Sequence, residues 1–471
     1  MSAGDELVNL DAMATAAAVR SGGIKATEVL DATLARIAGR DPAINSFTTV
    51  TEARARAEAE RVDRAVADGE DPGPLAGVPV AVKNLFDIRG VVTLSGSAID
   101  AESAPATADA AAVAALTRSG ALVVGALNMD EYAYGFTNEN SHVGPCRNPH
   151  DLARVAGGSS GGSGAAVAAG LVPLTLGTDT NGSVRVPAAL CGTFGFKPTF
   201  GRITRRGSTL FAPSLDHVGP LARSVRDLAL AFDVLHGFDS ADPVSLNRPV
   251  EHTLAHIDEG IVGLRIAVAD DYFTRGCHRI VLDALDKVVS ALSVSRRVTI
   301  LEAERARAAA MVITAAEGAS LHMSDLMTRP HDFDPMTRDR FLAGALVPGA
   351  HYVRAQRFRA WYRREVAAVF RTVDIILAPT TPFAATPIGQ RTIEVDGRDV
   401  VVAPNMGLFT QPLSFVGLPV VSVPVAGSEP MPLGVQIIGA PYAEKNVLRV
   451  AAALEAMGVA SAPVVETGPA R

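Results

Sequence analysis

The sequence is poor in several residue types, and each shortage argues against a class of protein. Three cysteines among 471 residues, at unrelated spacings, argue against a disulfide framework and favour a reducing, cytoplasmic compartment. No run of apolar residues is long enough for a membrane span, and the first residues lack a signal-peptide pattern. The 43 basic residues are outnumbered by 50 acidic ones and form no basic, aromatic-rich stripe, so we expect no nucleic-acid partner.

Metal and phosphate motifs are also missing. The ten histidines include no His-Glu-x-x-His pair and no other paired ligand spacing, so metal catalysis is poorly supported. A glycine–serine run at 157–163 is not followed by the lysine that a phosphate-binding loop requires. We therefore expect no metal and no other cofactor.

Helix and strand signals alternate along the chain. Apolar, strand-like segments occur at 78–86, 121–125, 264–268, 374–379, 420–425 and 433–438. Helical patterns lie between them, and alternation on this scale predicts an α/β fold in which helices cover both faces of a large sheet. We expect one domain over 1–471, with a helical N-terminal segment at 1–70, a mostly helical flank at 276–371 and a loose tail at 462–471.

Two serines lie in glycine-rich turns on either side of an apolar segment. Ser159 lies in the run 157–163, and Ser183 follows Gly182 just before a helix. The apolar residues 165–176 between the turns are typical of a helix packed on a buried strand, so the core holds both turns in place. Tight glycine turns in such a place usually present N–H groups and hydroxyls to a ligand.

A lysine, Lys83, ends the apolar strand at 78–86, where a charge is costly unless it is paired or functional. Each of these features has a plainer interpretation when taken singly. A lysine after a strand is usually a surface residue, a glycine–serine run is usually a linker, and the turn before Ser183 is as readily an ordinary one.

Taken together, the segments resemble the amidase signature family. The similarity covers nearly the whole chain and is strongest over GPLAGVPVAVKNLFD, GALNMDEYAYGFTNENS, residues 157–202 and SLDHVGPLARSV. The separations of 76 residues from Lys83 to Ser159 and of 24 residues from Ser159 to Ser183 agree with that family. The resemblance implies the amidase signature fold, with a large mixed central sheet.

The same resemblance implies a catalytic triad. Lys83 matches the family's catalytic lysine, Ser183 its acyl-forming nucleophile, and Ser159 the bridging serine that follows a cis peptide bond, here after Gly158. A serine hydroxyl needs a base, and lysine can serve only if burial lowers its pKa far below its ordinary value of ~10.4.

The residues before Ser183 complete the predicted site. Backbone N–H groups around Thr180, Asn181 and Gly182 would form an oxyanion hole at the start of the helix. Asp179 and Arg185 flank this loop with opposite charges, so we expect them to pair. Most of the family has a second glycine where this chain has Asn181, whose side chain hints at a polar substrate.

One branch of the family, the large subunits of carboxybiuret hydrolases in cyanuric acid (s-triazine) breakdown, is similar to this chain in the segments VKNLFDI, NMDEYAYGFT, DTNGSVRVPAALCG, SLDHVGP, TRDRFLAGAL and Thr410-Gln411-Pro412. This resemblance implies hydrolysis of a terminal amide of a small ureide. The implied reaction converts carboxybiuret to urea-dicarboxylate and ammonia. It also implies a small helical companion subunit, with two copies of each chain. The candidate substrate contacts are Tyr132, Tyr134, Asn138 and Arg338, with Arg340, Arg354 and Arg357 as further arginines.

Two other functions stay open. The chain could be an amidase for another small amide or ureide, or a glutaminase-like subunit of a tRNA-dependent amidotransferase. Asn181 and the branch-specific segments argue against the amidotransferase. An inactive scaffold is disfavoured, because all three triad positions are filled.

Overall fold

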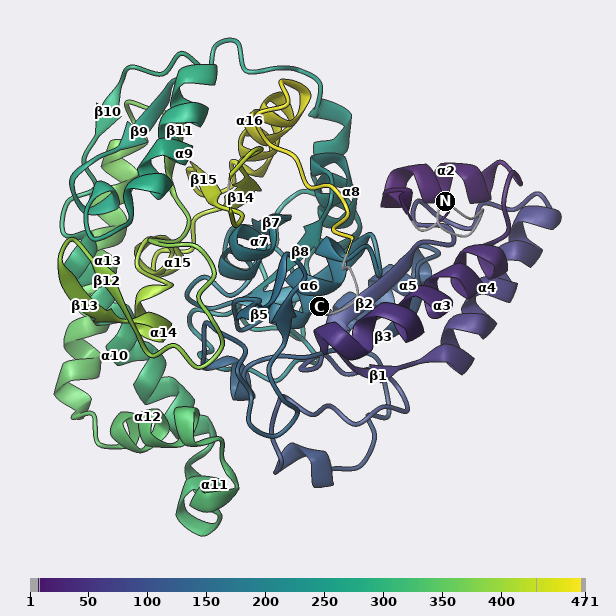
Figure 1. Cartoon of the computed structure of the whole chain (residues 1–471), viewed down its shortest axis with the longest axis horizontal. Helices are drawn as coiled ribbons and strands as arrows, with labels where there is room; N and C mark the ends of the chain where they lie inside the picture. The colour runs from purple at the N-terminus through teal and green to yellow at the C-terminus, as the bar shows by residue number, and fades with distance from the viewer. Residues whose placement is uncertain (1–6, 8, 429, 467–471) are drawn as a thin grey trace.

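A computed structural model describes residue 7, residues 9–428 and residues 430–466. Within that part of the chain, eleven strands form one sheet that runs across the molecule (Figure 1). In spatial order they are β1 (Phe47–Val50), β3 (Leu122–Leu127), β2 (Pro79–Lys83), β6 (Leu174–Asp179), β8 (His217–Ala222), β7 (Phe194–Lys197), β14 (Val420–Pro424), β15 (Gly434–Gly439), β11 (Ile375–Pro379), β9 (Ile266–Ala269) and β10 (Arg297–Val298).

The sheet is mixed, as the sequence resemblance implies. β3, β2 and β6 are parallel neighbours, and so are β11, β9 and β10. The pairs from β6 through β8, β7, β14 and β15 to β11 are antiparallel. The parallel run β3–β2–β6 brings three carboxyl ends to one edge of the sheet, and the candidate site is built there.

Helices cover both faces, because the buried strands carry apolar side chains on both sides. In β2, Val80 and Val82 belong to one hydrophobic cluster and Ala81 to another. The first cluster includes residues of α5 (Ala111–Arg118), α8 (Val225–Leu235) and α16 (Glu444–Ala456). The second includes residues of α3 (Ala26–Ile44), α4 (Glu52–Ala67) and α6 (Gly161–Ala168). The predicted α/β architecture is confirmed.

The remaining elements lie around this core. The N-terminal segment adds α2 (Ala12–Arg20) beside α3 and α4 (Figure 1). The flank consists of α9 (Arg279–Ala291), α10 (Ala303–Leu321), α11 (Met323–Thr328), α12 (Pro335–Ala345) and α13 (Gly349–Val369). Shorter elements are α7 (Arg185–Cys191), α14 (Val402–Asn405), α15 (Gln411–Ser414), and the strand pairs β4 (Arg147–Asn148) with β5 (Asp151–Val155) and β12 (Thr392–Val395) with β13 (Arg398–Val401).

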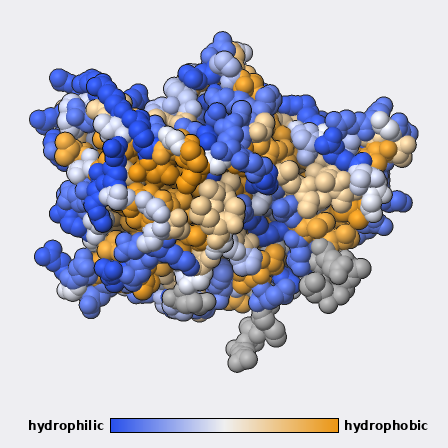
Figure 2. All heavy atoms as spheres, turned by 90° about the horizontal axis from the view of Figure 1, so that it is seen from above, coloured by the Kyte–Doolittle hydropathy of each residue, from blue (hydrophilic) through white to orange (hydrophobic). Residues whose placement is uncertain are grey.

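The surface and the chain end add two observations. Seen from above, hydrophilic side chains surround separate hydrophobic areas (Figure 2). Among the described residues, no helix is long and apolar enough to cross a membrane. The expected loose tail is attached where it is described, because Val465 N donates to the Ala168 carbonyl over 2.8 Å. Residues 467–471 of that tail lie outside the described chain.

Candidate active site

Lys83 lies at the carboxyl end of β2 and is fully buried. Its Nζ donates to Ser159 Oγ over 2.6 Å and to Thr178 Oγ1 over 2.9 Å. Both partners are neutral hydroxyls. No carboxylate of the described residues lies within ion-pair distance of this amine.

The environment of Lys83 favours the neutral amine. Burial lowers the pKa of Lys83 to about 7, while the negative charges of Asp130, Asp216 and Asp179 act in the opposite direction. A lysine with such a pKa is substantially unprotonated near neutral pH, which a general base requires.

Ser159 lies where the chain enters α6. The Gly158–Ser159 peptide bond is cis, as the family resemblance implies. Ser160 N donates to the Ser183 carbonyl over 3.2 Å, so the two serine-bearing turns are in direct contact. The structure therefore brings Lys83, Ser159 and Ser183 into one buried region, although they are far apart in the sequence.

The loop before Ser183 presents unpaired backbone donors. The N–H groups of residues 181–183 have no acceptor within the described part of the chain. Gly182 has a φ of 143°, a conformation that favours glycine, and Thr410 Oγ1 holds the loop by donating to the Asn181 carbonyl over 2.6 Å. Asn181 Nδ2 donates to Thr314 Oγ1 of α10 over 3.0 Å. The arrangement suits an oxyanion hole.

A buried ion pair braces this loop from behind. Arg185 donates to both carboxylate oxygens of Asp179, from Nε over 2.8 Å and from Nη2 over 2.9 Å. The same guanidinium bonds Gln436 Oε1, and the Ser414 hydroxyl donates to Asp179. Burial alone would raise the pKa of Asp179, but the charge of Arg185 lowers it well below its usual range. The predicted pairing of Asp179 with Arg185 is confirmed.

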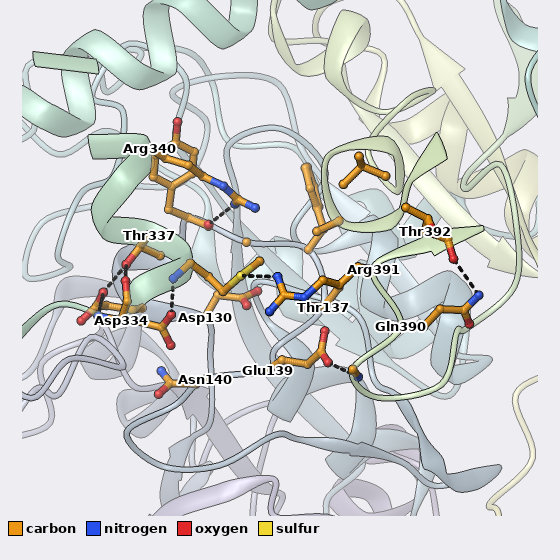
Figure 3. Close-up of a pocket in the computed structure, with 18 residues that line it drawn as sticks. Asp130, Thr137, Glu139, Asn140, Asp334, Thr337, Arg340, Gln390, Arg391 and Thr392 are labelled. Atoms are coloured by element: carbon orange, nitrogen blue, oxygen red, sulfur yellow. Dashed lines mark hydrogen bonds between the residues drawn. The ribbon is translucent and has the colours of Figure 1, made fainter. Parts of the chain in front are cut away.

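Ser183 opens into a cavity of about 360 Å³. The wall is mostly apolar, and its polar residues include Thr180, Asn181, Thr314, Gln411 and Arg340. A second cavity of about 440 Å³ shares Tyr134, Gly135, Phe136 and Arg340 with the first. Figure 3 shows this second cavity, with Asp334, Thr337 and Arg340 of the α12 region on one side and Gln390 and Thr392 on the other.

The candidate aromatic and amide residues have different surroundings. Tyr134 lines both cavities, and its ring packs on Phe211 and Phe341. Tyr132 lines neither cavity and packs against His322, with its hydroxyl donating to Asp100. Asn138 also lies behind the wall, where its Nδ2 donates to Asn128 Oδ1 over 3.0 Å.

The candidate arginines also separate. Arg338 pairs with Asp339 and lines neither cavity, and Arg354 and Arg357 are exposed on α13. Arg340, one turn from the start of α12, lines both cavities. Its Nη1 donates to the Tyr134 carbonyl over 2.9 Å, and it forms no ion pair with a described residue. The structure thus places Arg340, and not Arg338, on the wall of the cavity into which Ser183 opens.

Sequence reasoning missed three groups around Lys83. Thr178 accepts a hydrogen bond from the amine, and Asp130 and Asp216 face it with their charges. Asp130 could have been found, because it comes shortly after the strand-like segment at 121–125. Thr178 sits inside a strand and carries no such signal.

Comparisons with known proteins agree with the geometry. A family model described as "Amidase" matches residues 28–448. AtzE, the 1-carboxybiuret hydrolase subunit of Pseudomonas sp. (strain ADP), is 52% identical over 444 residues, which cover 94% of this chain and 97% of that protein. A glutamyl-tRNA(Gln) amidotransferase subunit of Anaeromyxobacter sp. (strain K) is 39% identical, covering 96% of each chain.

Solved structures are similar along the same length. A chain of an inhibitor-bound vestigial protein complex, which reveals the evolutionary origins of an s-triazine catabolic enzyme, has a TM-score of 0.95 and 50% identity, covering 96% of this chain and 99% of that one. A bacterial aryl acylamidase of the amidase signature family has a TM-score of 0.87 and 29% identity, covering 95% of this chain and 96% of that one.

Proposed function

The chain belongs to the amidase signature family, hydrolases of amide C–N bonds, and from this premise we propose that it releases ammonia from a small carboxylated ureide. The observation that carries the proposal is the fully buried Lys83, whose amine donates to Ser159 Oγ beside the Ser183 loop. The proposed substrate is carboxybiuret, which appears in the name of the 52% identical relative.

The proposed reaction begins with two proton transfers. Neutral Lys83 takes a proton from Ser159, and Ser159 takes one from Ser183, whose Oγ attacks the terminal amide carbonyl. The N–H groups of residues 181–183 stabilise the resulting oxyanion. As the C–N bond breaks, the proton returns from Lys83 through Ser159 to the leaving nitrogen, and ammonia departs.

Water then completes the cycle. It loses a proton along the same relay, attacks the acyl–Ser183 ester and restores the serine hydroxyl. The net reaction is carboxybiuret plus water to urea-dicarboxylate plus ammonia. It consumes no oxidant, metal or cofactor.

The cavity supports a substrate with a carboxylate. Arg340 is the cation on the wall shared by both cavities, and no described carboxylate pairs with it. A guanidinium can hold a carboxylate with two N–H donors. We assign Arg340 the substrate carboxylate, with Tyr134 as the ring beneath the guanidinium, 5.5 Å from it.

The setting of the enzyme belongs to the same proposal. The similar solved structure is a protein complex, which supports a companion subunit for this chain. We propose a small helical companion, with two copies of each chain. The three cysteines are all free and buried, which supports a reducing, cytoplasmic setting.

The test is ammonia release from carboxybiuret, biuret, allophanate, glutamine and simple aliphatic amides, with and without a co-expressed companion subunit. Turnover of carboxybiuret that is lost in Ser183→Ala supports the proposal. Preferred turnover of glutamine would instead favour the function of the 39% identical amidotransferase subunits. Ammonia release that persists in Ser183→Ala would remove Ser183 from the nucleophile role.

A second comparison tests the carboxylate assignment. Arg340→Met should raise KM for carboxybiuret about 10-fold or more and leave biuret hydrolysis nearly unchanged, because only carboxybiuret needs the cation. Arg338→Met is the matched control, since Arg338 lies on the same helix but pairs with Asp339. Equal effects of the two substitutions would refute the assignment.

A further inference from the structure

The buried carboxyl group of Asp130 lies beside the proposed triad but has no role in the proposed reaction. β2 and β3 are parallel and Lys83 pairs with Leu127, so the residues after β3 lie at the same edge as Lys83. Asp130 N donates to the Ser159 carbonyl over 3.3 Å. Asp130 is only 7% exposed, at the wall of the cavity in Figure 3.

The carboxyl of Asp130 is packed under the peptide that carries Ser159. A Cβ added to Gly158 would stand 2.0 Å from Asp130 Oδ2, and one added to Gly135 would stand 2.3 Å from Oδ1. Both glycines therefore leave the space that the carboxyl fills. Oδ1 accepts from Asn138 N over 3.0 Å, whereas Oδ2 is buried and has no hydrogen-bond partner among the described residues.

Three buried carboxyl groups act on Lys83 through their charge, and two of them have hydrogen-bond partners on both oxygens. Asp179 is held by both donors of Arg185. Asp216 accepts from a threonine hydroxyl and from two backbone N–H groups. Asp130 is the carboxyl with an oxygen to spare, so its charge is the least compensated by local donors.

The pKa shifts of Asp130 and Lys83 show that the charges of these two groups act on each other. Burial raises the pKa of Asp130, and the positive charge of Lys83 is the strongest influence that opposes this shift and favours the carboxylate. Burial lowers the pKa of Lys83 to about 7, and Asp130 is the strongest influence that raises it. The other charges that act on Asp130 are Arg340, which favours the carboxylate, and Asp334, which disfavours it.

We propose that Asp130 is a positioning residue that acts through Lys83: its carboxylate seats the Ser159 peptide and compensates the ammonium that forms when Lys83 takes the proton. This inference rests on the proposed function, in which Lys83 is the base. Without the charge of Asp130, Lys83 would lose its proton at a lower pH. The Lys83 ammonium that forms during the reaction would also be less stable.

The experiment measures a pH profile that does not depend on the natural substrate. Phenylmethylsulfonyl fluoride sulfonylates an activated serine with loss of fluoride, and its second-order rate of inactivation follows the fraction of neutral base. We would record this profile for the wild type, Asp130→Asn, Asp130→Glu and Asp227→Asn. Ammonia release from carboxybiuret would be measured alongside it.

Asp130→Asn should move the acid limb to lower pH by about one unit and lower kcat, because a nearby opposite charge has been removed. Asp130→Glu keeps the charge, so its acid limb should stay near that of the wild type, with slower reaction because the longer side chain presses on Gly158. Asp227→Asn is the control. Asp227 is a buried carboxyl whose pKa burial also raises to about 7, but it bonds Ala12 N and Met13 N and does not face Lys83.

Each outcome is decisive. An unshifted acid limb in a folded Asp130→Asn enzyme would overturn the inference and leave Asp130 a packing role. If Asp130→Asn does not fold, Asp130→Ser removes the same charge and carries the same prediction. A wild-type enzyme that is inactivated without a label on Ser183, as read by mass spectrometry, would instead overturn the proposed function.

Discussion

Gly182→Ala tests whether the loop before Ser183 is an oxyanion hole. The φ of Gly182 is 143°, a region that residues with a Cβ rarely adopt. The added Cβ would also stand 2.2 Å from Thr410 Oγ1 and 2.8 Å from Thr410 Cβ. Thr410 cannot swing away freely, because its hydroxyl is buried and bonded to the Asn181 carbonyl.

The size of the effect follows from these contacts. The loop and Thr410 must separate by about 1 Å to restore ordinary van der Waals contact. A displacement of that size can cost about 100-fold in rate, and loss of one oxyanion donor costs about 10²–10³-fold in kcat. The backbone strain adds about 1–3 kcal/mol of destabilisation. We therefore expect kcat to fall at least about 100-fold and the melting temperature to fall by a few degrees.

Ammonia release and thermal unfolding would be measured on Gly182→Ala and on a control, Gly192→Ala. Gly192 follows α7 with a φ of 70°, and its added Cβ would meet His150 Nε2 at 3.1 Å, outside the cavities. The control should lose stability but keep kcat within about twofold, because its strain does not reach the N–H donors. A Gly182→Ala enzyme that keeps more than about a tenth of wild-type kcat would refute the role of this loop.

Further predictions concern the buried charges. Lys83→Met should abolish most activity at neutral pH. Wild-type kcat/KM should fall as the pH drops below about 7, because Lys83 becomes protonated there. A wild-type profile of kcat/KM that stays flat through pH 6 would contradict Lys83 as the base. Between about pH 7 and 10.5 the unfolded chain binds a proton at Lys83 that the folded chain does not. The free energy of unfolding of the wild type, relative to that of Lys83→Met, should therefore rise with pH in that range. Urea unfolding at several pH values measures this difference. Arg185→Leu should lower the free energy of unfolding by about 3–5 kcal/mol, because Asp179 would stay buried without its cation; a loss under about 1 kcal/mol would mean that the pair is not structural.

Local patterns in the sequence carried much of the architecture. The apolar segment at 78–86 became β2, and the segments at 420–425 and 433–438 became β14 and β15, because fully apolar strands must be covered on both faces. The two glycine-rich turns were correctly placed in a core. The opposite charges of Asp179 and Arg185 were enough to predict their pair.

The walls of the cavities were much less predictable. Tyr132 and Tyr134 are two residues apart, yet Tyr132 packs on His322 and Tyr134 faces the cavities. Arg338 and Arg340 are equally close, yet only Arg340 lines the cavities. Which way a side chain points in an irregular loop or on a helix depends on the partners packed against it, and those partners come from distant parts of the chain.

The sequence by itself therefore determined the α/β fold, the family and the residue types and spacing of the Lys83, Ser159 and Ser183 segments, because these depend on local periodicity, glycine turns and motif order. Only the tertiary structure decided that Lys83 touches Ser159, that Asp130 lies beneath Gly158 and that Arg340 lines the same cavity as Ser183. Burial and long-range charge set the chemistry of these groups. Both properties arise only when strands and helices from separate regions of the chain pack together.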